Sequence, residues 1–287
     1  MARLLRHPCG ESRIVSATLC GMPVLPRGGI SATPIGGPTA LLEIGGLRLL
    51  TDPTFDQPGE YPVGQRSLVK TQPPAWSAEQ VGRVDAVLLS HDQHPDNLDA
   101  AGRQFLATAP LVLTTGSAAE RLGGTAVALT AWAHTDLARP DGGELRVTAV
   151  PARHGPPGTE HLTGEVTGFV LTGSDLPTVY VSGDNAALEL VADIATRFAP
   201  IQVAVLFAGG AQTALLGDAY LTLSSEMAAE AAAILSGAQV IPVHTDGWAH
   251  FTQGGHTLPA AFERAGLSEV LRLTPPGVTV QLSGSAP

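Results

Sequence analysis

Cysteine is nearly absent from this chain of 287 residues: the only two are Cys9 and Cys20, both in its first stretch. A zinc site built from cysteines, or catalysis by a thiol, is therefore excluded for the main body of the chain. A disulfide between these two residues would close only the N-terminal segment.

Lysine is rarer still, since Lys70 is the only lysine among 16 basic residues. The formal net charge is −10. Proteins that bind nucleic acid over a broad surface need clustered basic residues to displace counterions from phosphate. The charge balance therefore argues against a nucleic-acid partner.

Long hydrophobic runs are missing too, and none approaches the roughly 20 apolar residues that span a bilayer. Arg3, Arg6 and Arg13 are not followed by the continuous apolar segment of a secretory signal peptide. The sequence therefore predicts a soluble, cytoplasmic protein with no membrane-inserted segment.

The remaining composition is that of a globular protein, with 44% hydrophobic and 15% charged residues. Glycine and proline are spread through the chain, which indicates many short elements joined by tight turns. No linker-like tract divides the sequence. We therefore expect a single domain over residues 31–287, preceded by an extension of uncertain order at residues 1–30.

Short apolar runs predict a strand-rich fold. The clearest is a hairpin of strands at 39–44 and 47–51, turned at Gly45 and Gly46, because glycine accepts the positive φ of a tight turn. Two sheets packed face to face, with helices outside, would bury such runs in one domain. Further strands are predicted at 84–90, 111–114, 126–130, 145–150, 166–171, 178–182, 201–207, 240–243 and 278–282, and helices at 98–106, 118–122, 186–198, 224–235 and 258–265.

Polar residues recur at one kind of place, the end of a predicted strand. Loops at strand ends are where a rigid scaffold brings together side chains from distant parts of the chain. Imidazole and carboxylate, the groups found there, are also the ligands that zinc and similar metals prefer. These positions hold Asp52, the run His91–Asn97, His154, Asp184 and His244.

Taken singly, most of these residues have a structural alternative. His154 and His244 have the character of ordinary hydrogen-bonded histidines at strand ends. Asp52 precedes Pro53, a position typical of a turn residue. Asp184 follows Gly183, and its structural alternative is the N-cap of a helix. The run His91–Asn97 differs, because it places two histidines and two aspartates within six residues directly after an apolar strand. That run indicates a metal site.

Five short motifs follow one another along the chain: Leu49–Pro53, Ser90–Asp99, His154–Gly155, Ser182–Asp184 and Pro242–His244. In this order they resemble the motifs of the metallo-β-lactamase superfamily. The similarity is greatest to the branch that contains ascorbate-phosphate lactonases and N-acyl-phosphatidylethanolamine phospholipase D, and it runs from about Ile35 to His250. The resemblance implies an αββα sandwich, in which two mixed sheets lie face to face with helices outside.

One motif departs from the family pattern His-x-His-x-Asp-His. It reads His91-Asp92-Gln93-His94-Pro95-Asp96-Asn97, so Asn97 stands where the last histidine belongs. The first ligand is then either His91, with one inserted residue, or Asp92 at the strict spacing. Imidazole matches that ligand position better, which favours His91. A neutral amide is a poor ligand for zinc, so Asn97 weakens the case for a second metal.

The resemblance implies a divalent metal as cofactor, one or two zinc ions, with manganese or iron as alternatives. Asp52 would lie behind the ligands. It would fix the tautomer of a ligating histidine by accepting a hydrogen bond from the ring N–H that does not bind the metal. One metal would be held by His91 (or Asp92), His94 and His154, and a second by Asp96 and His244, with Asp184 as the bridge.

A metal site of this kind favours hydrolysis, because a bound divalent metal lowers the pKa of its water from 15.7 to about 7. Asp96 would orient the water or take its proton. His250 would act as an acid for the leaving group or as a substrate contact. For His250, as for Asp246, a structural role is the alternative.

The other polar residues carry weaker patterns. Arg153 would pair with an anionic substrate or, as we favour, form a surface salt bridge. The glycines of the loop at 209–218 indicate close approach or mobility, and not a phosphate cradle, because no P-loop lysine follows. His134, His161 and His256 are interpreted as solvated or structural.

The sequence thus predicts a metal-dependent hydrolase that acts on a small ester, lactone or phosphoester. Two alternatives are a non-hydrolytic, iron-dependent redox protein of the same fold and a metal-poor binding protein with a degenerate site. Fold-level similarity does not choose a substrate. The oligomeric state stays open.

Overall fold

The computed structural model describes residues 29–64 and 66–283. The expected extension at residues 1–30, with Cys9 and Cys20, lies outside these residues except for its last two positions, which begin the first strand. Among the helices of the described ranges, none is long and apolar enough to cross a bilayer.

The first sheet holds seven strands within the described residues, in the order β15–β1–β2–β3–β6–β7–β8. The pairs from β15 to β3 are antiparallel, whereas β3, β6, β7 and β8 run parallel. The strands are β1 (Gly29–Gly36), β2 (Thr39–Ile44), β3 (Leu47–Thr51), β6 (Ala86–Leu88), β7 (Val112–Thr114), β8 (Ala126–Ala128) and β15 (Val280–Ser283).

The second sheet holds six strands of the described chain, in the order β14–β13–β12–β11–β10–β9. Here β12, β13 and β14 run parallel, and the pairs from β12 to β9 are antiparallel. The strands are β9 (His134–Ala138), β10 (Glu144–Pro151), β11 (Thr167–Thr172), β12 (Val179–Val181), β13 (Val203–Phe207) and β14 (Gln239–Val243).

The layer between the two sheets is apolar, and it joins side chains of β1, β2, β3 and β6 to those of β10–β14. In β13, Val203, Val205 and Phe207 pack into this layer, whereas Ala204 and Leu206 face the helices outside. Because successive side chains of a strand point to opposite faces, a strand covered on both sides appears in the sequence as one apolar run.

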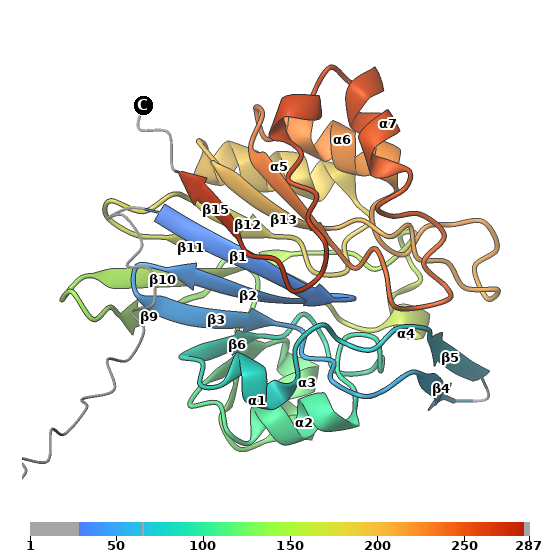
Figure 1. The fold of residues 1–287 in the computed structure, drawn as a ribbon. Coiled ribbons are helices and arrows are strands. Elements are labelled where there is room, and N and C mark those ends of the chain that lie inside the picture. The colour runs from blue at the N-terminus through green and yellow to red at the C-terminus, as the bar shows by residue number, and fades with distance from the viewer. Residues whose placement is uncertain (1–28, 65, 284–287) are drawn as a thin grey trace, which may run out of the picture.

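Helices cover the outer face of each sheet, with α5–α7 on the second sheet and α1–α3 on the first (Figure 1). The predicted αββα sandwich of two mixed sheets is therefore confirmed. The helices are α1 (Ala78–Val81), α2 (Ala100–Leu106), α3 (Gly116–Leu122), α4 (Glu160–Thr163), α5 (Leu188–Phe198), α6 (Ser225–Ile234) and α7 (Leu258–Arg264), with a 3₁₀ turn, η1 (Ser268–Val270).

A separate two-stranded hairpin, β4 (Gly59–Val63) and β5 (Arg66–Lys70), projects beside the ends of the sheets (Figure 1). Main-chain hydrogen bonds tie it to the loop after β14: Thr71 N–H donates to the Gly247 carbonyl at 2.7 Å, and Ala249 N–H donates to the Val69 carbonyl at 2.9 Å. The hairpin therefore has a fixed place next to this loop.

Several elements were not predicted from the sequence, namely β1, β4, β5, β9, α1, α4 and η1. Strand β9 lies at the edge of its sheet and is half exposed, and β4 contains Pro62, so neither has the apolar run of a buried strand. Helix α1 did carry a signal: Ser77 and Gln80 form a capping box, with hydrogen bonds of 3.3 and 2.8 Å.

Strand direction brings the predicted polar positions to one edge of the sandwich. Strands β3 and β6 are parallel, and β10 and β12 are both antiparallel to β11, so they run the same way as each other. Strand β14 is parallel to β13 and β12. The carboxyl ends of β3 and β6 lie together, as do those of β10, β12 and β14.

The contact between α2 and the segment after β3 can be tested with a pair of glycine substitutions. Gly102→Ala should destabilise the protein by about 1–3 kcal/mol, because an ideal Cβ at this position would lie 1.9 Å from the carbonyl oxygen of Pro53. Gly116→Ala in α3 is the control, since a Cβ there meets nothing within 4 Å. Alanine should leave stability unchanged or raise it by up to about 1 kcal/mol there. Urea unfolding measures the free energy of unfolding of both variants. Equal values for the two variants would contradict the close contact between Gly102 and Pro53.

Candidate metal centre

Three histidines from two loops form the first half of the site. His91 and His94 follow β6, and His154 follows β10; each offers a ring nitrogen, and the three nitrogens lie within 4.8 Å of one another. His91 Nε2 and His94 Nδ1 are 2.9 Å apart, a separation that needs a proton or a cation between their lone pairs. The rings themselves pack edge to face or tilted, with centroids 4.9–5.4 Å apart.

The first two of these imidazoles are neutral at ordinary pH. Burial, together with the neighbouring histidines, lowers the pKa of His91 to about 3 and that of His94 to about 4. A neutral imidazole is the form that binds a metal. His91 and His94 are therefore in the form that binds a metal.

The orientation of His91 is set from behind by Ser90 and Asp52. Asp52 accepts hydrogen bonds from Ser90 N–H and from Ser90 Oγ–H, both at 2.6 Å. Since the Ser90 proton is donated to Asp52, Ser90 Oγ accepts from His91 Nδ1–H at 3.0 Å, and Nε2 is left with its lone pair toward the cluster. The sequence predicted that Asp52 would itself accept a histidine N–H; the structure instead inserts the Ser90 hydroxyl between them.

His154 is oriented in the same way by a main-chain carbonyl. Its Nδ1–H donates to the Leu221 carbonyl at 2.9 Å, because a carbonyl oxygen can only accept. In the neutral imidazole, Nε2 is then the nitrogen with the free lone pair. Both histidines therefore have a tautomer fixed by a partner outside the cluster, as ligating histidines do.

The second half of the site consists of Asp96, Asp184 and His244, which follow β6, β12 and β14 and offer ligand atoms within 4.8 Å of one another. His244 Nε2 lies 3.3 Å from Asp96 Oδ2 and 3.5 Å from Asp184 Oδ1. Asp184 Oδ2 lies 3.5 Å from His154 Nδ1. Asp184 thus stands between the two halves.

The negative charge of Asp96 and Asp184 is balanced only in part by the neighbouring histidines. Burial alone would raise the pKa of Asp96, but His250 and His244 hold it well below its usual range. Burial would likewise lower the pKa of His244, but Asp184 and Asp96 raise it. Asp96 Oδ1 and Asp184 Oδ2 are buried without a hydrogen-bond partner among the described residues. Buried carboxylate oxygens of this kind, facing three imidazole lone pairs, fit a divalent cation.

Asn97, the departure from the family pattern, is buried behind the carboxylates. Its Nδ2 donates to Asp52 Oδ2 and to Asp184 Oδ1, both at 3.0 Å. Burial raises the pKa of Asp52 to about 7, against the lowering effect of the Ser90 and Asn97 hydrogen bonds. The amide therefore holds two carboxylates in place and presents a donor, not a lone pair, toward Asp184.

Asp92, the alternative first ligand, faces away from the cluster. Its carboxylate accepts from Arg121 Nε at 3.1 Å and lies 3.6 Å from Arg103 Nη2. It is not part of either group of converging ligand atoms, whereas His91 is. The inserted residue of this motif is thus accommodated in the loop, and His91 lies with His94 and His154 in the cluster.

His244 depends on a close main-chain approach. It has the left-handed φ of 57°, and its N–H donates to the Gly37 carbonyl at 2.6 Å. An ideal Cβ on Gly209 would lie 1.9 Å from the His244 carbonyl oxygen. The first glycine of the loop at 209–218 thus serves the close approach expected from the sequence. Asp246, whose role was open, accepts from Gly37 N–H at 2.8 Å.

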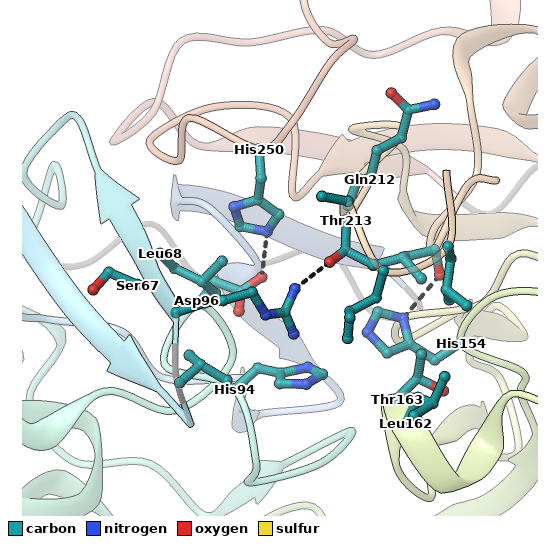
Figure 2. A pocket seen from close by; sticks show the side chains of 17 residues that line it. Ser67, Leu68, His94, Asp96, His154, Leu162, Thr163, Gln212, Thr213 and His250 are labelled. Carbon is teal, nitrogen blue, oxygen red and sulfur yellow. Dashed lines mark hydrogen bonds and ion pairs between the residues drawn. The ribbon is translucent and has the colours of Figure 1, made fainter. Parts of the chain in front are cut away.

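His250 is the one predicted catalytic residue that lies outside the two ligand groups. Its Nε2–H donates to Asp96 Oδ2 at 3.1 Å, and its ring packs against Phe251 with centroids 4.6 Å apart. Figure 2 shows His250, Asp96, His94 and His154 around one cavity, with the contact from His250 to Asp96 dashed. From the sequence, His250 was only a candidate; in the structure it lies beside Asp96.

The cavity itself has a volume of about 340 Å³. Histidine and carboxylate line its inner end, and leucines and alanines line much of the rest. Arg66 of β5 and Thr213 of the loop after β13 meet across it through a hydrogen bond from Arg66 Nη1 to Thr213 Oγ1. The loop at 209–218, which contains Thr213, was named from the sequence without this residue, and Arg66 was missed because it does not lie at the end of a predicted strand.

The remaining candidates lie away from the site. Arg153 forms an ion pair with Glu189, the surface salt bridge that we favoured. The side chains of three histidines are exposed, as expected: His134, His161 and His256.

The sequence matches the family model described as "Beta-lactamase superfamily domain" over residues 47–245, more than half of the chain. A search of curated proteins finds no match. The matched range contains Asp52, both ligand groups and Asn97.

Solved structures share the fold at low sequence identity. An isothiocyanate hydrolase from Delia radicum gut bacteria has a TM-score of 0.74 and 22% identity, covering 88% of this chain and 100% of that one. A protein described as a possible metal-dependent hydrolase, from Veillonella parvula DSM 2008, has a TM-score of 0.72, 18% identity and coverage of 88% and 99%. CmlA, a diiron β-hydroxylase from Streptomyces venezuelae, has a TM-score of 0.58, 16% identity and coverage of 90% and 54%. With its αββα sandwich and its matched range, this chain belongs to the β-lactamase superfamily.

Proposed function

We propose that this protein is a metal-dependent hydrolase that uses a metal-activated water on a small ester, lactone or phosphoester. The observation that carries the proposal is the pair of adjoining ligand groups, three histidines beside two carboxylates and a fourth histidine, at the inner end of an open cavity. A purely structural network would pair its buried carboxylate oxygens with donors, and two of these oxygens have none among the described residues.

In this proposal His91, His94 and His154 hold one metal, Asp96 and His244 hold a second, and Asp184 lies between them. Nitrogen and oxygen ligands of these types suit zinc best, and manganese or iron as alternatives. When bound, a divalent metal supplies a Lewis acid and, by lowering the pKa of water to about 7, a hydroxide nucleophile at neutral pH.

The protein's own groups divide the proton transfers. Asp96 is a buried carboxylate with one oxygen that has no hydrogen-bond partner among the described residues, so it can orient the attacking water and accept its proton. His250 lines the cavity and keeps Nε2–H directed at Asp96. It is placed to give a proton to the leaving oxygen as the scissile bond breaks.

The range of substrates to test follows from the chemistry of attack by water. Esters and lactones offer an electrophilic carbon, and phosphoesters offer phosphorus. The isothiocyanate hydrolase with the same fold adds isothiocyanates, whose central carbon is also electrophilic. A panel of a phosphodiester, a lactone, a thioester, an aryl ester and an isothiocyanate, assayed with protein purified without chelator, covers these classes.

Metal analysis of the same preparation separates hydrolysis from the alternatives. Zinc or manganese with turnover of any panel member supports the proposal. Iron with no hydrolysis would favour a redox role like that of the diiron β-hydroxylase, since carboxylates and histidines also suit iron. Metal stoichiometry near zero, with a ligand still bound in the cavity, would favour a binding protein.

Ser90 offers the first specific test, because it holds the His91 tautomer. Ser90→Ala removes the acceptor for His91 Nδ1–H. It should weaken the affinity of the three-histidine position for metal by about 10- to 100-fold. Ser174→Ala, at an exposed turn, should leave affinity unchanged. Competition with a chromogenic chelator measures both variants. Wild-type affinity in Ser90→Ala would show that the hydroxyl does not orient the ligand.

Asn97 tests the second metal position. Since the amide presents a donor toward Asp184, metal titration of chelator-stripped wild type should show two unequal steps, or one step only. Asn97→His supplies the imidazole found at the matching family position and should tighten the second step. Asn97→Ala, which loses the same hydrogen bonds without adding a ligand, should not. Identical calorimetric titrations for wild type and Asn97→His would place residue 97 outside the coordination sphere.

His250 tests the acid role. His250→Gln should lower kcat on the best panel substrate by about 10²- to 10⁴-fold, because a positioned proton donor is lost, while metal content stays at the wild-type value. The effect should shrink for a substrate whose leaving group needs no protonation, such as a nitrophenolate. His256→Gln, on an exposed histidine, is the control. Unchanged kcat in His250→Gln would remove this residue from the mechanism.

A further inference from the structure

We propose that Arg66 is a specificity-determining residue that binds an anionic group of the substrate, while the leucines around the cavity mouth hold an apolar chain. This inference rests on the proposed function for the position of the scissile bond. It names the substrate class: a small hydrolysable molecule with an aliphatic or aryl part and one negative charge remote from the bond that is cut.

Arg66 is a cation whose charge is left available. Its side chain is exposed, lines the cavity and donates to the neutral hydroxyl of Thr213. No carboxylate lies within ion-pair distance of it among the described residues. Several other arginines pair with carboxylates; for example, Arg146 pairs with Asp136, and Arg153 pairs with Glu189. A guanidinium has five N–H donors, and within the described ranges only one hydrogen bond from the Arg66 guanidinium is formed, so the other donors are available to a ligand.

Geometry gives Arg66 a defined place relative to the reacting centre. It lies on β5, and the hairpin is tied by main-chain hydrogen bonds to the residues just before His250. The same cavity has His94, Asp96 and His154 at its inner end. A ligand that contacts these three residues therefore lies in the same cavity as the guanidinium, whose planar fork matches carboxylate, phosphate or sulfonate oxygens.

The opposite wall is apolar and open to solvent. Leu162 of α4 and Leu215 of the loop after β13 are 47% and 56% exposed, large values for leucine, and both line the cavity. Leu216 and Leu221 continue the wall inward. Exposed apolar side chains around a concave site mark a place where an apolar group of a ligand is buried. In a protein of net charge −10, one free cation beside such a wall selects for an amphiphilic anion.

The test is a binding measurement, so that it does not depend on turnover. Isothermal titration calorimetry on the metal-containing protein would compare 1-hexanesulfonate with its neutral analogue, hexyl methyl sulfone. Sulfonates are weak metal ligands, which limits competition from the metal site. Arg66→Gln should weaken sulfonate binding by about 10- to 100-fold and change sulfone binding by less than twofold. Arg83→Gln, which removes an equal charge at an exposed position before β6, should change neither.

The apolar wall has its own readout in the same assay. Wild type should bind 1-hexanesulfonate more tightly than 1-propanesulfonate, and Leu215→Ser should narrow that difference. Val127→Ser, at a comparably exposed residue of β8, should not. If the affinity for sulfonates depends on chain length equally in wild type and Leu215→Ser, the apolar wall does not bind the alkyl chain, and this part of the proposal is wrong.

An equal affinity of wild type and Arg66→Gln for the sulfonate, or an absence of sulfonate binding to wild type, would overturn the assignment of Arg66. Failure of the proposed hydrolase function has a different signature: the Arg66-dependent preference for the anion would persist, but no member of the substrate panel would be cleaved. Cleavage of neutral and anionic aryl esters with the same kcat/KM in wild type and Arg66→Gln would leave the hydrolase intact and contradict only the specificity role.

Discussion

Burial of negative charge is the constraint on which the site depends. Asp52, Asp96 and Asp184 are at most 3% exposed, and an unpaired carboxylate in such a place costs several kcal/mol. Asp52 meets this requirement within the protein, through the Ser90 and Asn97 hydrogen bonds. Asp96 and Asp184 do so only in part, since each keeps one oxygen without a hydrogen-bond partner in the described chain. A cation held between these two carboxylates and the histidines would complete the balance.

The sandwich serves this constraint by strand direction. Strands of both sheets end at one edge, where short loops carry the candidate ligands, while the apolar layer between the sheets holds those ends in place. The β4–β5 hairpin lies over the same edge and is bonded to the loop that carries His250. The framework thus positions the candidate ligands, and the hairpin and loops form the cavity above them, which is how one fold accommodates many substrates.

Much of the fold was accessible from the sequence, and the candidate ligands could be named from it because each follows an apolar strand, as His244 follows 240–243. Contacts between side chains that only folding brings together could not be predicted from the sequence. The insertion of Ser90 between Asp52 and His91 depends on the distance between two strand ends, and pairing of Asp92 with Arg121 depends on how α3 packs. Arg66 had no signal at all, since it lies on an exposed hairpin without an apolar pattern.

Anomalous X-ray scattering at the zinc, iron and manganese edges, from crystals of protein purified without chelator, tests the central claim most directly. The account predicts a strong peak within bonding distance of His91, His94 and His154, at about 2.0–2.1 Å for zinc. A weaker peak is expected about 3.5–4 Å away, beside Asp96, Asp184 and His244. Crystals with no anomalous peak among these six residues, or with metal bound only elsewhere on the chain, would contradict it.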